Sequence, residues 1–79
     1  MKFQIYSKYG CSYCTKIETV FKMLKLNHTV HKLGEHFTKE EFKEMFGNVG
    51  FPQVILNDEE KLGGCIDTIK YLKENSLVS

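Results

Sequence analysis

The stretch KYGCSYCTK, residues 8–16, lies where one hydrophobic pattern of this chain gives way to another. Before it, residues 2–6 alternate between polar and apolar, with Phe3 and Ile5 on one face, which predicts a β-strand. After it, the apolar residues recur every three or four positions, at Tyr13, Ile17, Val20, Phe21 and Leu24. That spacing predicts an amphipathic helix of three to four turns, which begins at the Cys-x-x-Cys pair and ends by Asn27.

The middle of the chain predicts a second strand and a second helix. Residues 28–33, HTVHKL, are typical of an extended segment centred on Val30. Thr38 and Glu41 then form a capping box, and Gly47 is placed to end the helix that follows.

The last third predicts two short strands and a final helix. The strands are residues 52–56 and 61–64, separated by the turn sequence NDEE. The helix spans 67–75, with Asp67 as its N-cap, and we expect three apolar side chains on its inner face: Ile66, Ile69 and Leu72.

The resulting order, β-α-β-α-β-β-α, predicts one α/β domain over residues 1–79. The first β-α-β should form a right-handed parallel unit, and the later β-β an antiparallel hairpin. We therefore expect a four-stranded mixed sheet with three flanking helices.

The composition excludes several classes of protein. A chain of 79 residues with 42% hydrophobic residues and ten aromatics can bury a core, so global disorder is excluded. The net charge is +1 with interleaved signs, which argues against a nucleic-acid or membrane partner. No apolar run approaches a membrane span, and the N-terminus does not resemble a secretion signal. We expect a cytoplasmic monomer.

The position of the two cysteines predicts their chemistry. The reactive form of cysteine is the thiolate, and the first turn of a helix stabilises an anion through its free N–H groups and dipole. Lys8 and Lys16 add positive charge nearby. Cys11 lies at the exposed edge of that turn and Cys14 one turn further in, so we expect Cys11 to attack and Cys14 to resolve.

A zinc site is the competing interpretation of the same cysteines. Thirteen residues separate Cys14 from His28, and His31 follows, which approaches the layout of a zinc finger. Only two residues separate the histidines, however, and both lie on a predicted strand, where positions three apart face opposite sides. We interpret His28, His31 and His36 as solvent-facing polar residues and expect no metal site.

Three segments in order resemble the glutaredoxin family. IYSKYGCSYC (5–14) resembles its strand and active-site segment, FPQV (51–54) its T-V-P-Q segment, and GGCID (63–67) its G-G-x-x-D segment. The resemblance runs nearly end to end. It implies a thioredoxin-like fold and reversible thiol–disulfide exchange with glutathione as reductant and co-substrate.

The resemblance also implies a glutathione site. Lys8 would meet the glycine carboxylate, the backbone of Phe51 beside a cis Pro52 would pair with the cysteine residue of glutathione, and Asp67 would meet its amino group. Tyr13 would either flank the ligand or begin the core of its helix. Three further residues complete the implied site: Gly64, Cys65 and Ile66. Cys65 is expected to be a buried small hydrophobe without a redox role.

The chain departs from the family pattern at several positions. Ser12 stands where the commonest dithiol form has proline, which changes the reduction potential. Gly50 and Phe51 replace the usual threonine and valine, and Glu44 lies where relatives tend to carry a basic or amide residue. These differences predict weaker glutathione binding.

Two other functions stay open from sequence. Relatives with this Cys-Ser-Tyr-Cys variant include carriers of a [2Fe–2S] cluster between two chains, in which Cys11 would be the ligand. A small electron donor served by thioredoxin reductase would share the fold. For the leading interpretation, the expected protein partners carry disulfides or are glutathionylated, and ribonucleotide reductase would suit.

Overall fold

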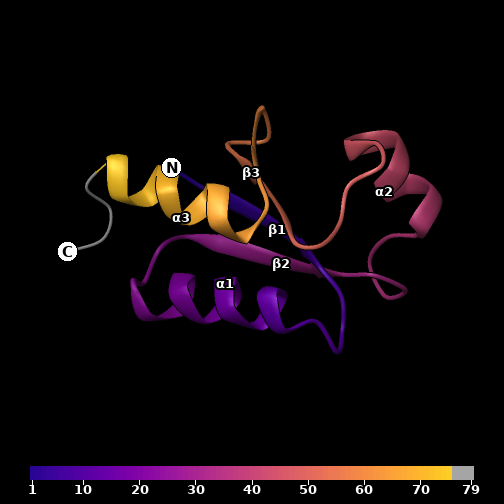
Figure 1. Cartoon of the computed structure of the whole chain (residues 1–79), viewed down its shortest axis with the longest axis horizontal. Coiled ribbons are helices and arrows are strands. Elements are labelled where there is room, and N and C mark those ends of the chain that lie inside the picture. Colours follow the sequence, from indigo (N-terminus) through magenta and orange to yellow (C-terminus); the bar gives the residue numbers. More distant parts are fainter. Residues whose placement is uncertain (76–79) are drawn as a thin grey trace.

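The computed structural model describes residues 1–75 and contains four strands and three helices in the predicted order (Figure 1). The strands are β1 (Phe3–Ser7), β2 (His28–Lys32), β3 (Gln53–Leu56) and β4 (Glu60–Gly63). The helices are α1 (Ser12–Met23), α2 (Lys39–Phe46) and α3 (Cys65–Glu74).

The four strands form one mixed sheet in the order β2-β1-β3-β4. β1 runs parallel to β2, with Ile5 opposite Val30, and antiparallel to β3, with Ile5 opposite Val54. β3 and β4 form an antiparallel pair. The predicted α/β class, the parallel β-α-β unit and the hairpin are confirmed.

One face of the sheet carries the main core. α1 and α3 contact each other and pack on the face to which Phe3 and Ile5 point. The buried members of this core come from β1, α1, β3 and α3: Phe3, Ile5, Ile17, Phe21, Val54, Leu56, Cys65 and Leu72. Burial of each large side chain stabilises the fold by about 1.5–3 kcal/mol, which fixes both helices.

On the opposite face of β1, Tyr6 belongs to an aromatic cluster, which also contains Phe37, Phe42, Phe46 and Phe51. The Tyr6 ring meets those of Phe37 and Phe46 edge to face, with centroids 5.2 and 5.3 Å apart. Phe42 on α2 stacks on Phe51, with centroids 4.1 Å apart. These contacts attach α2 to one end of the sheet, away from α1 and α3 (Figure 1).

Local signals predicted the start of α2 and misplaced the start of α3. The Thr38 hydroxyl accepts from the Glu41 N–H, and the Glu41 side chain accepts from the Thr38 N–H, so the capping box is confirmed. The N-cap of α3 is Gly64 without a side-chain cap, so the assignment of Asp67 as N-cap was wrong. Ile66 is 73% exposed, which corrects the expectation that it faces inward.

The expectation that the β2 histidines, His28 and His31, face solvent was wrong. Both His28 and His31 are half-buried. The Nε2 atom of His31 lies 2.6 Å from Gln4 Oε1, and its ring stacks on Tyr6. Burial lowers the pKa of His31, with a smaller contribution from the charge of His36. None of the helices within residues 1–75 is long and apolar enough to cross a membrane.

Candidate functional site

The two cysteines of the motif occupy the first turn of α1. β1 ends at Ser7, and Gly10, with a φ of +73°, allows the turn that brings the chain to the helix. Cys11 is the N-cap, and its Sγ accepts a hydrogen bond of 3.2 Å from the Cys14 N–H. A sulfur at this point receives an N–H donor and the positive end of the helix dipole, both of which stabilise its thiolate.

The second cysteine is held in the protonated state. Cys14 is fully buried, whereas Cys11 is partly exposed. Burial is the largest cause that raises the pKa of Cys14 from 9.0 to about 12, and a hydrogen bond between its thiol and that of Cys11 is the next. The geometry therefore makes Cys11 the accessible sulfur and Cys14 the protected one, as the sequence predicted.

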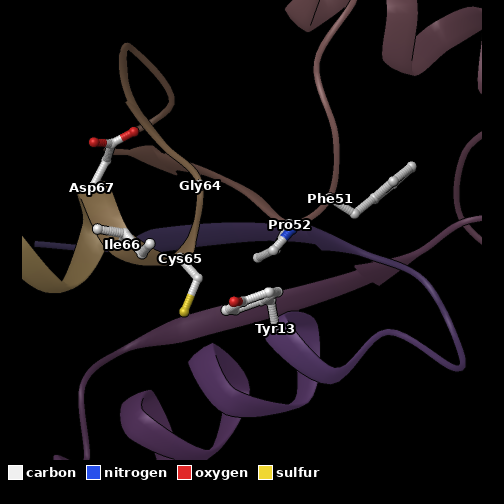
Figure 2. A pocket seen from close by; sticks show the side chains of 7 residues that line it. All are labelled: Tyr13, Phe51, Pro52, Gly64, Cys65, Ile66 and Asp67. Atoms are coloured by element: carbon white, nitrogen blue, oxygen red, sulfur yellow. The ribbon is translucent and has the colours of Figure 1, made fainter.

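A pocket of about 340 Å³ lies beside this turn (Figure 2). Seven residues line it: Tyr13, Phe51, Pro52, Gly64, Cys65, Ile66 and Asp67. They come from the start of α1, the segment before β3 and the start of α3. Every residue that the resemblance assigned to the glutathione site lines the pocket, with the exception of Lys8.

One wall of the pocket is the Phe51–Pro52 segment. The peptide bond between them is cis, as expected, and Pro52 is buried. Phe51 lies outside the helices and strands of residues 1–75, and none of the backbone hydrogen bonds in the turns and loops of these residues involves it. Its N–H and C=O are therefore available to a ligand. The Lys8 Nζ atom lies 5.2 Å from the centroid of the Phe51 ring, so this lysine adds positive charge to the same wall.

The opposite wall is the turn into α3. Gly63 has a φ of +103°, and a Cβ atom there would lie 2.7 Å from Asp67 Oδ2. A Cβ on Gly64 would lie 3.4 Å from the Pro52 carbonyl oxygen. Glycines at both positions thus let the start of α3 approach Pro52, and the Asp67 carboxylate lies against the Gly63 turn (Figure 2).

The structure decides two roles that the sequence left open or uncertain. Tyr13 is 54% exposed and lines the pocket, so it flanks the site and is not a core residue. Cys65 is 5% exposed, and burial raises the pKa of its thiol, which agrees with a structural role at the pocket wall.

Sequence reasoning missed the support behind Phe51. Phe42 stacks on the Phe51 ring, and a hollow bordered by Lys39 and Lys43 adjoins both aromatic residues. The spacing of Phe42 in its helix marks an inward face, but its pairing with Phe51 depends on the tertiary structure. Two lysines, and not Glu44, border this side of the wall.

Comparison with known proteins agrees with this geometry. The family model described as Glutaredoxin matches residues 3–60. The chain is 32% identical over 78 residues to the chloroplastic glutaredoxin-C5 of Arabidopsis thaliana, covering 92% of this chain and 44% of that protein. It is 33% identical over 79 residues to the mitochondrial glutaredoxin-2 of Pongo abelii, covering 94% and 48%. The chain thus spans about half the length of these curated relatives.

Solved structures have the same fold. Reduced Escherichia coli glutaredoxin superposes with a TM-score of 0.81 at 23% identity, covering 99% of this chain and 100% of that one. The buckwheat glutaredoxin–glutathione complex superposes with a TM-score of 0.78 at 19% identity, covering 95% and 71%. At these identities, the likeness establishes the thioredoxin-like fold.

Proposed function

The chain belongs to the glutaredoxin family of thiol–disulfide oxidoreductases, and from that membership we propose that it reduces protein disulfides and glutathione mixed disulfides with glutathione as reductant. The observation that carries the proposal is the hydrogen bond from the Cys14 N–H to Cys11 Sγ at a helix start that adjoins the pocket.

The reaction begins at Cys11. Its thiolate attacks one sulfur of the substrate disulfide, forms a mixed disulfide, and displaces the other sulfur as a thiolate that takes a proton from water. Cys14 then loses its proton and attacks Cys11 Sγ, which releases the second substrate thiolate. One glutathione opens the Cys11–Cys14 bond at Cys11, and a second attacks the glutathionyl sulfur. Two electrons pass from two glutathione molecules to one disulfide.

The difference between the two thiols orders these steps. The hydrogen bond to Cys11 and its negative charge both raise the pKa of Cys14, after the larger effect of burial. Both contributions depend on Cys11 as a free sulfur, and the negative charge is lost once Cys11 is in a mixed disulfide. Cys14 therefore becomes easier to deprotonate only after the first step, when it is needed.

The pocket supports the proposed binding of glutathione. Glutathione carries a carboxylate at each end and an amino group beside one of them. The free backbone of Phe51 can pair with its central peptide, and Lys8 lies at the Phe51 wall for one carboxylate. The start of α3 offers N–H groups for the other carboxylate, and Asp67 offers an anion for the amino group.

The cluster-bridged dimer is the second candidate function. It would take Cys11 as the ligand of this chain, because Cys14 and Cys65 are both buried. We favour the dithiol reductase, because Cys14 is placed one turn from Cys11 where it can close a disulfide. We propose that it acts in the cytoplasm, on disulfide-bearing proteins such as ribonucleotide reductase.

The test is reduction of the mixed disulfide of glutathione and 2-mercaptoethanol, with glutathione, glutathione reductase and NADPH. We expect the Cys11→Ser variant to lose all activity. The Cys14→Ser variant should retain activity, since glutathione itself can resolve the mixed disulfide at Cys11.

The two other functions give different results in the same experiment. A native chain that is inactive with glutathione and active with thioredoxin reductase and NADPH would replace the proposal by the electron donor. A brown dimer after anaerobic purification, inactive with both reductants, would replace it by the cluster carrier.

A further inference from the structure

A second groove lies between α1 and α3, directly beside the active-site pocket. Its volume is about 520 Å³, and it is lined by Lys16 of α1 and by Ile66, Ile69, Lys70, Lys73 and Glu74 of α3. Ile66 also lines the active-site pocket, where its side chain is drawn beside Cys65 (Figure 2). The groove and the pocket therefore form one continuous surface across Ile66.

The groove combines an apolar strip with a net positive charge. Ile66 and Ile69 lie three residues apart on α3, so their side chains are neighbours on one side of the helix. The ion pair recorded among residues 1–75 joins Lys32 to Glu18, so no groove lysine has a carboxylate within 4 Å in that part of the chain. Three lysines face one glutamate, Glu74.

We propose that this groove binds an acidic segment of the substrate protein that carries an apolar side chain, next to the disulfide being reduced. The inference rests on the proposed reductase function and names the class of protein that it serves. The apolar side chain would cover Ile66 and Ile69, and the carboxylates would meet Lys70 and Lys73. Lys16 extends the positive charge toward the active site, since it lowers the pKa of Cys65 against the larger effect of burial.

The size of the groove sets the length of the segment. Ile66 and Lys73 are seven residues apart, about 10 Å along the helix axis. An extended peptide covers this distance with about three residues. The recognised segment is therefore three to four residues beside the substrate cysteine.

The hollow beside Phe42 and Phe51 is less suited to bind an acidic segment, and its lysines provide the control for the groove. Its lysines, Lys39 and Lys43, lie on α2, which also carries Glu40, Glu41 and Glu44. That helix has one more negative than positive side chain, so it does not favour an acidic partner.

The test uses two short peptides, each with one cysteine in a mixed disulfide with glutathione. Asp, Glu and Leu flank the cysteine in one peptide, and Lys, Ser and Gly in the other. Combining Lys70→Glu with Lys73→Glu should raise KM for the acidic peptide about tenfold and leave reduction of the mixed disulfide of glutathione and 2-mercaptoethanol unchanged. The matched control, Lys39→Glu with Lys43→Glu, makes the same change in net charge and should leave KM for the acidic peptide unchanged.

An equal rise in KM for the acidic peptide in the two double variants would overturn the groove as a recognition surface. An unchanged KM in both of them would also overturn it. A redox-inert acidic peptide, with serine in place of its cysteine, separates this inference from the proposed function. Inactivity of the native chain toward every disulfide would refute the reductase. Binding of the inert peptide, lost in the Lys70 and Lys73 variant and kept in the control, would still support the groove, whereas no binding would refute it.

Discussion

The protonated state of Cys14 predicts how the stability of the fold depends on pH. Its pKa is about 12 in the folded chain and near 9.0 when the thiol is solvated. Above pH 9 the unfolded chain loses this proton while the folded chain keeps it, so the free energy of unfolding falls as pH rises. Between pH 8 and pH 10 this one group should lower it by about 1.4 kcal/mol.

The measurement is urea denaturation at pH 8 and pH 10 with a phosphine reductant, for the native chain and for Cys14→Ala. The variant lacks the thiol, so its loss of stability over this interval should be smaller by that amount. Titrating groups that are distant from Cys14 cancel in the comparison, because they are common to both chains.

Cys14→Ser serves as the matched control for the small cavity that alanine leaves. Its hydroxyl does not ionise in this range, so both variants should show the same pH dependence despite different stabilities. If the native chain and both variants lose stability in parallel, the Cys14 thiol ionises as easily in the fold as in water, and the assigned division between an attacking and a protected sulfur is wrong.

Two other changes test the packing around the pocket. Phe42→Ala removes a 5%-exposed ring from the aromatic cluster and should lower the free energy of unfolding by about 3–5 kcal/mol in urea titration; a loss below about 1 kcal/mol would contradict its structural role. Gly63→Ala puts a Cβ 2.7 Å from Asp67 Oδ2 at a positive φ, and should cost at least about 1 kcal/mol by the same assay. Gly50→Ala, which has open space and no positive φ, is the control and should be close to neutral.

The sequence predicted the fold because its local and nonlocal patterns agree. The alternation around Ile5 and the helical spacing from Ile17 change period at the motif, and the Thr38 capping box fixes the start of α2 without help from tertiary contacts. The implied site residues come together because the end of β1, the start of β3 and the end of β4 lie at the same end of the sheet, beside the first turn of α1.

The errors arose where a local preference met a competing constraint. Asp67 is a favoured N-cap residue, yet α3 starts two residues earlier, because the glycine turn from β4 already places Gly64 in the extended conformation of a cap. Ile66 fits a helical apolar stripe, but this earlier start points it to the pocket. The partner of His31 is Gln4, which follows from the register of the parallel strands and not from neighbours in sequence.

The stacking of Phe42 on Phe51 has a consequence for how this protein can diverge from its relatives. Phe51 forms a wall of the active-site pocket, and the ring that supports it from behind belongs to a helix outside the pocket. Substitutions on α2 can therefore reshape the substrate's surroundings while the cysteines and the glycine turn keep their positions. Selection for a new substrate has a route through α2 that leaves the redox chemistry of the first turn intact.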